Sequence, residues 1–97
     1  MTKNEITKQL QALKPLLDSH HVQRLRLFGS VVRDEANKNS DIDLLVDFKS
    51  TPDLWSFIGL QRELSEKLSC TVDLVTTEAL HPALREQILK EAQDVRF

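Results

Sequence analysis

The sequence has little cysteine and no long run of apolar residues. Its one cysteine, Cys70, cannot form an intrachain disulfide, and no cluster of cysteine and histidine has the spacing of a structural zinc site. Without about eighteen consecutive apolar residues there is no candidate membrane-spanning helix, and the N-terminus lacks the apolar segment of a signal peptide. We therefore expect a cytoplasmic protein with no membrane partner.

The sequence also lacks an excess of charge of one sign. Its 13 basic and 15 acidic side chains leave a net charge of −2, which does not favour sequence-independent binding of a nucleic-acid backbone. Only two glycines and three prolines interrupt a chain that is 40% hydrophobic, so a disordered tail or linker is excluded. At 97 residues we expect one domain, spanning 1–97, with one core.

Apolar periodicity predicts helices that alternate with short strands. Thr2 and Glu5 have the spacing of a capping box before a helix that Pro15 should break. Residues 22–28 and 41–48 alternate as strands, and 71–76 is a short β-branched strand. Pro82 should begin a last helix. The residues predicted to form the buried face of this helix are Leu84, Ile88, Leu89 and Ala92.

A longer helix is predicted between the second and third strands. Thr51 is its expected N-cap and Pro52 its first residue. Trp55 is interpreted as an anchor for this helix, with stacking on a base as the alternative. The residues expected on its buried face are Leu54, Phe57, Ile58, Leu64 and Leu68. The whole order indicates an α/β (α+β) fold in which helices cover a small sheet.

Two aspartates at the start of the second strand are candidate functional residues. Asp41 and Asp43 lie two apart on a strand, so both carboxylates project from one face, about 6 to 7 Å apart along the chain. Such a pair either shares a proton or binds a hard divalent cation such as Mg²⁺. Asp47 shares the face but lies roughly 13 Å beyond Asp43, too far to share the cation.

Further residues complete a candidate phosphate-handling site. Gly29 and Ser30 end the first strand, where a small residue, backbone amides and a hydroxyl can bind phosphate. Arg33 is either a counter-charge for that phosphate or a surface salt-bridge partner, for example of Glu35. If the second and third strands pair, Asp73 lies beside Asp43, where it can complete a metal site or deprotonate an attacking hydroxyl.

The segment GSVVRDEANKNSDIDLLV resembles the GS-xx-R and DxD pattern of the minimal nucleotidyltransferases (MNT group) of the DNA polymerase β superfamily. The resemblance implies a polymerase β-like fold with a small mixed sheet. It also implies nucleotide phosphates on Gly29 and Ser30, metals on Asp41 and Asp43, and Asp73 as the third carboxylate. The resemblance implies, too, that ATP is the nucleotide donor and that the metal is Mg²⁺.

The resemblance further implies a function. With no fused module, the chain is similar to the antitoxins of HEPN/MNT toxin–antitoxin pairs, which predicts a protein adenylyltransferase that modifies and neutralises a HEPN-type toxin. Two alternatives stay open. One is an antitoxin that masks the toxin by binding without chemistry. The other is nucleotide addition to an RNA end, which the net charge and the lack of a basic stripe with aromatics disfavour. Self-association is left open by the sequence.

Overall fold

The computed structural model describes residues 2–33 and 41–97. Its elements, in chain order, are α1 (Lys3–Ala12), α2 (Lys14–Ser19), β1 (Val22–Phe28), the 3₁₀ turn η1 (Gly29–Val31), β2 (Ile42–Phe48), α3 (Leu54–Leu68), β3 (Val72–Thr76), the 3₁₀ turn η2 (Thr77–Ala79), α4 (Pro82–Glu91) and β4 (Gln93–Val95). The strands form one sheet in the order β3-β2-β1-β4. β1 is antiparallel to β2 and to β4, whereas β2 and β3 are parallel. The predicted small mixed sheet flanked by helices is confirmed.

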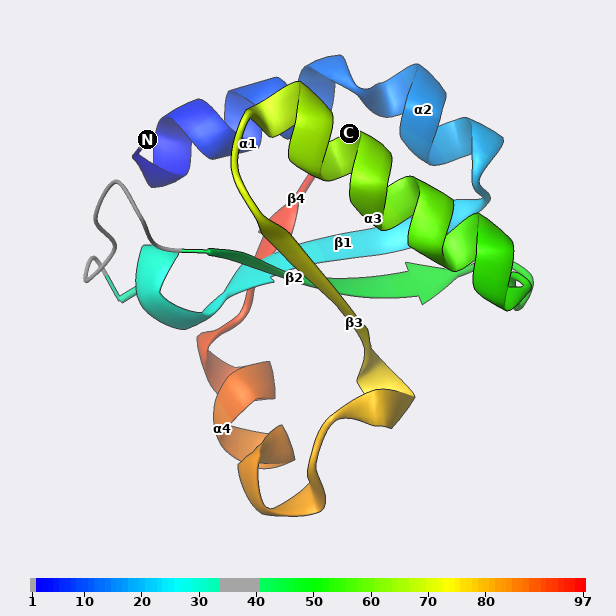
Figure 1. Ribbon diagram of the computed structural model, residues 1–97. Coiled ribbons are helices and arrows are strands. Elements are labelled where there is room, and N and C mark those ends of the chain that lie inside the picture. The colour runs from blue at the N-terminus through cyan, green and yellow to red at the C-terminus, as the bar shows by residue number, and fades with distance from the viewer. Residues whose placement is uncertain (1, 34–40) are drawn as a thin grey trace.

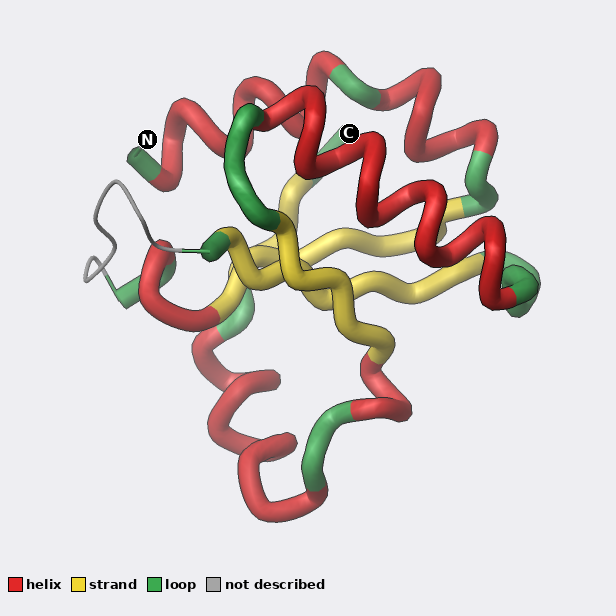
Figure 2. Tube along the Cα trace, in the orientation of Figure 1, coloured by secondary structure: helices red, strands yellow, loops and turns green. Residues whose placement is uncertain are grey.

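The core lies between the sheet and a layer formed by α1, α2 and α3, which cover one face, while α4 lies on the other (Figure 1). Figure 2 shows the same separation of helices by the strands. The helices and the sheet contribute fully buried aliphatic side chains to this core; among them are Ile6, Leu10, Leu17, Leu25, Leu27, Leu44, Val46, Leu60 and Leu64. Close packing of this layer gives the sheet a rigid base on which to present its opposite face.

The N-terminal predictions are confirmed. The Thr2 hydroxyl accepts a hydrogen bond from the Glu5 amide at 3.2 Å, so Thr2 is the N-cap of α1. The helix ends at Ala12, and Pro15 occupies the first turn of α2, where its missing donor is tolerated.

The predicted start of α3 is wrong. Asp53, not Thr51, is the N-cap, because its carboxylate accepts from the Ser56 amide at 2.8 Å. The buried face is predicted in part: Leu64 and Leu68 are buried as expected and Phe57 packs against the core, whereas the buried Leu60 was not predicted. Exposed apolar residues precede it: Leu54 is 67%, Trp55 81% and Ile58 37% exposed. Trp55 is therefore not an anchor for the helix.

The C-terminal region differs from the prediction in two ways. α4 begins at Pro82 as expected, but none of its residues is buried, and Leu84 is 53% exposed. Ala92 caps the helix instead of packing inside it, and the chain then adds β4 to the free edge of β1. Val95 of this strand is buried against the core, which accounts for the pairing.

The other edge of the sheet is shielded by α3. The Val72 amide donates to Ser65 Oγ at 3.0 Å and the Leu74 amide to Gln61 Oε1 at 3.0 Å. Side chains thus satisfy donors that an edge strand would offer to another chain. Among the described residues no helix has the length and apolar character needed to cross a bilayer.

Candidate active site

Two of the predicted carboxylates lie side by side. Parallel pairing of β2 and β3 places Asp43 directly opposite Asp73, as the sequence predicted. The neighbours of Asp73, Val72 and Leu74, are buried on the other face, so Asp73 is exposed on the face away from α1 to α3. Asp41 precedes β2 and is exposed. The strand register therefore concentrates negative charge at one end of the sheet.

The charges of these groups act on one another. Burial raises the pKa of Asp43 above its usual value, and the charges of Asp73 and then Asp41 raise it further. Arg33 acts in the opposite direction. A half-buried carboxylate repelled by two others is a site where a cation would relieve the repulsion, and carboxylate oxygen is the donor that Mg²⁺ prefers. The residues present therefore fit a hard divalent cation.

A shared metal site for all three carboxylates stays a prediction. Over residues 2–33 and 41–97, no three side chains of histidine, cysteine, aspartate or glutamate are grouped closely enough to hold a metal ion together. Asp43 is the described carboxylate on which the charges of both others act, so it is the centre of the group.

Gly29 is required by the position of Asp43. Phe28 pairs with Asp43 across β1 and β2, which brings the following residue against the carboxylate. Gly29 has a φ of +79°, and a Cβ added to it would collide with the Asp43 carboxylate, only 3.1 Å from its Cγ. Ser30 follows in η1 and is half-buried. The absence of a side chain at Gly29 thus allows the Asp43 carboxylate to lie close to the backbone of this turn.

Arg33 extends from the end of this turn towards α4. Its Nη1 contacts Glu91 Oε2 at 3.3 Å, and its guanidinium is also close enough to lower the pKa of Asp43. The proposed partner Glu35 lies outside the described residues. Arg33 therefore lies between α4 and the carboxylates.

Asp47 belongs to a separate ion pair that the sequence did not indicate. The Arg26 guanidinium, on a residue that is 8% exposed, donates to Asp47 Oδ2 at 3.3 Å. Thr77 Oγ1 donates to Asp47 Oδ1 at 2.6 Å. Arg26 alternates with the buried Leu25 and Leu27 along β1, but alternation cannot show that the face carrying Arg26 is covered there. Asp47 therefore holds strands together at a distance from Asp43.

Replacing Asp47 by alanine is expected to lower the free energy of unfolding by about 2 to 3 kcal/mol, because it leaves the buried Arg26 guanidinium without its carboxylate. Chemical denaturation measures this. The control is Asp94→Ala, which removes the 2.7 Å partner of the exposed Arg24 and should cost much less. Equal losses for the two variants would contradict a buried pair.

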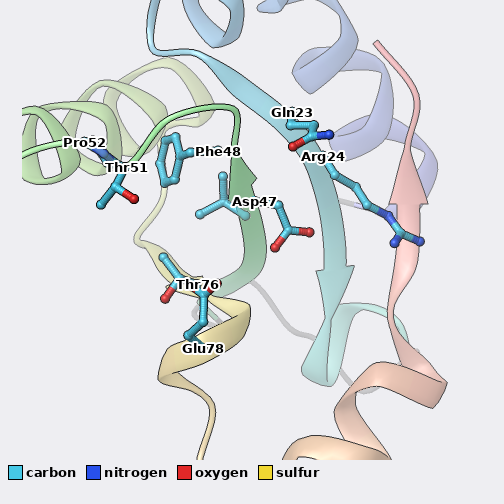
Figure 3. Close-up of a pocket in the computed structure, with 9 residues that line it drawn as sticks. Gln23, Arg24, Asp47, Phe48, Thr51, Pro52, Thr76 and Glu78 are labelled. Atoms are coloured by element: carbon cyan, nitrogen blue, oxygen red, sulfur yellow. The ribbon is translucent and has the colours of Figure 1, made fainter.

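A pocket of about 640 Å³ lies beyond Asp47, at the end of the sheet away from Asp43 (Figure 3). Asp47 and Phe48 line this region from β2, with Thr76 at the end of β3 and Glu78 in η2. It contains none of the residues predicted for the site, so the candidate chemistry does not depend on it.

Comparison with known proteins identifies the family of this chain. A family model of the nucleotidyltransferase domain matches residues 4–95. Protein adenylyltransferase MntA of Thermococcus cleftensis is 39% identical over 92 residues, 94% of this chain and 93% of its own. MJ0435 of Methanocaldococcus jannaschii, assigned as a protein adenylyltransferase, is 41% identical over 95 residues, 98% and 99% of the two chains.

Solved structures share the architecture. A protein assigned as a minimal nucleotidyltransferase superposes with a TM-score of 0.81 at 39% identity, over 96% of this chain and 95% of that one. A toxin–antitoxin structure with AMP-PNP gives 0.76 at 26% identity, over 93% and 72%. The MntA–HepT toxin–antitoxin structure gives 0.61 at 28%, over 96% and 68%. The polymerase β-like fold expected from the sequence is thereby confirmed.

Proposed function

The chain belongs to the nucleotidyltransferase domain family and is related to the MntA antitoxins, and from this premise we propose that residues 1–97 act as one domain that transfers AMP from ATP to a hydroxyl group of a partner protein. The observation that carries the proposal is the register that sets Asp43 opposite Asp73, with Gly29 against Asp43. This arrangement joins a phosphate-binding turn to paired carboxylates, as nucleotidyl transfer requires.

Each predicted residue has a role in the proposal. Gly29, Ser30 and Arg33 bind the β- and γ-phosphates of ATP, and Asp41 and Asp43 hold Mg²⁺. The bound cation supplies positive charge that offsets the charge developing on the α-phosphate and the pyrophosphate. Asp73 takes the proton of the acceptor hydroxyl as its oxygen bonds to the α-phosphorus and the bond to pyrophosphate breaks.

The partner in the proposal is a HEPN-type toxin. Relatives at 26% and 28% identity were solved as toxin–antitoxin structures, one of them with a nucleotide analogue. The exposed apolar side chains of Leu54, Trp55 and Ile58 on α3 support a surface that binds protein. The same surface supports the second candidate, an antitoxin that masks the toxin without chemistry.

ATP with Mg²⁺ is expected to raise the stability of the domain by roughly 2.7 kcal/mol when ligand is at about a hundred times its Kd. For a domain of this size that raises the melting temperature by about 10 °C or more. The measurement compares thermal melts in ATP with Mg²⁺, ATP with EDTA, and Mg²⁺ alone. The same melting temperature in all three, at millimolar ATP, would remove the nucleotide donor from the proposal.

A further inference from the structure

Asp73, the carboxylate proposed to take the acceptor proton, lies on a strand that has a neighbouring strand on one side only. β3 is at the edge of the sheet and pairs with β2. The pairing sets Asp73 opposite Asp43, and two like charges directly across a strand pair repel each other. Repulsion between the two carboxylates therefore acts to separate β3 from β2 at the position where the site needs them together.

Two side chains of α3 bind the other side of β3, before and after Asp73. The Val72 amide donates to Ser65 Oγ at 3.0 Å, and the Leu74 amide donates to Gln61 Oε1 at 3.0 Å. Because Val72 and Leu74 are the two neighbours of Asp73 in the chain, these bonds fix the backbone on both sides of it. The hydrogen bonds from α3 to β3 are thus centred on Asp73.

The two acceptors are themselves oriented. Gln61 and Ser65 lie four residues apart, on one face of α3. Ser65 Oγ donates its one proton to the Gln61 carbonyl at 2.9 Å, which leaves the lone pairs of the oxygen for the Val72 amide. Leu60 and Leu64, which precede the two acceptors, are fully buried, so α3 is anchored in the core. The two hydrogen bonds therefore join β3 to a rigid element.

We propose that Gln61 and Ser65 are positioning residues that hold Asp73 in place beside Asp43 against the repulsion of the two carboxylates. The inference rests on the proposed function, in which Asp73 takes the proton of the acceptor hydroxyl. Neither positioning residue touches substrate in this scheme, and both act through the backbone of β3. If the two bonds served only to shield the sheet edge from another chain, their loss would leave the rate of each separate molecule unchanged.

The test compares Gln61→Met and Ser65→Ala, which remove the two acceptors, with the unmodified chain. In transfer of AMP from ATP to a HEPN-type toxin partner, each change should lower kcat about tenfold, because a small displacement of the proton acceptor slows the reaction. The KM for ATP should stay within about twofold, since the residues proposed to bind ATP and Mg²⁺ lie outside β3. Amide hydrogen exchange should become faster at Leu74 in the first variant and at Val72 in the second, which reports the loss of each bond without any activity measurement.

Two further variants are the matched controls. Ser65→Thr keeps the hydroxyl, which a helical threonine can also donate to the carbonyl four residues back, so it should retain most of the rate. Thr7→Ala on α1 removes a bond of the same kind, from Thr7 Oγ1 to the Lys3 carbonyl at 2.9 Å, without touching the hydrogen bonds of β3, so kcat should not change. In an Asp73→Asn background, Ser65→Ala should no longer lower kcat, because the group that it positions is absent.

The outcomes separate the inference from the function on which it rests. A kcat for Ser65→Ala as high as that for Thr7→Ala, or an equal loss with and without Asp73, would overturn the inference. So would a loss of rate that follows self-association of the variants in light scattering, because it would assign both bonds to protection of the sheet edge. Absence of stabilisation by a non-hydrolysable ATP analogue with Mg²⁺ in the unmodified chain, or transfer unaffected by Asp73→Asn, would instead overturn the proposed function.

Discussion

Under the proposed function, a small molar fraction of this chain, supplied with ATP and Mg²⁺, is expected to inactivate a large excess of a HEPN-type toxin partner, and each inactivated toxin molecule should gain the mass of one or more AMP groups. The reason is that AMP stays on the acceptor while the transferase is released to act again. Intact-mass spectrometry and residual toxin activity, both followed over time, measure the result. Inactivation should stop when ATP is omitted or Mg²⁺ is chelated.

The Asp43→Asn variant is the decisive comparison. It should reduce transfer by roughly a hundredfold to a thousandfold, because it weakens the carboxylate centre on which the proposal depends. Its fold should persist. The pKa of Asp43 is raised in the folded protein, so above that pKa its ionised form opposes folding, and a neutral amide removes the opposition. At neutral pH the ligand-free variant is therefore expected to melt no lower than the unmodified chain.

Inhibition by masking would give the opposite pattern. It would follow the molar ratio, need no ATP, survive Asp43→Asn and vanish on dilution below the Kd of the complex. The toxin mass would stay unchanged in every mixture, and Trp55→Ala on the exposed surface of α3 would then be the damaging change. Such a result would leave the aspartates without a use in neutralising the toxin.

The positions of Asp43 and Asp73 in the candidate site could be predicted from short-range sequence patterns. Alternation along β2 and β3 fixed which side chains share a face, and parallel pairing placed Asp43 opposite Asp73. Both strands keep their apolar residues in the core, and a shift by one residue would expose them. The position of these carboxylates was predictable because core burial and site geometry require the same register.

Other features depend on individual bonds and pairings that the sequence pattern does not show. Thr51 and Asp53 are both acceptable caps, and only the Asp53 bond to the Ser56 amide decides where α3 begins. β4 has three residues, too few for a periodic signal, and exists because the edge of β1 accepts it. The ion pairs Arg26–Asp47 and Arg33–Glu91 join residues 21 and 58 positions apart. Sequence pattern alone identifies such charges without their partners.

Replacing Gly29 by alanine is expected to lower the free energy of unfolding by roughly 2 to 4 kcal/mol and the melting temperature by about 10 °C or more. Two terms add. A φ of +79° is strained for any residue with a Cβ, and the new methyl group would collide with the Asp43 carboxylate. Because the carboxylate must move, ATP-dependent stabilisation and transfer should be lost as well. Thermal and chemical denaturation measure the first effect, and the ATP and Mg²⁺ melts the second.

The chain offers a matched control in its other glycine. Gly59 lies inside α3, and a Cβ there would meet nothing within 4 Å, so Gly59→Ala should stabilise the protein by about 0.5 to 1 kcal/mol. The collision is separable from the backbone strain by combining Gly29→Ala with Asp43→Ala. The double variant should be more stable than the sum of the single changes predicts, because no carboxylate remains to be displaced. Strict additivity would show that Gly29 and Asp43 do not meet in solution. A Gly29→Ala protein as stable as the unmodified chain would exclude the left-handed turn on which the proposed phosphate-binding site depends.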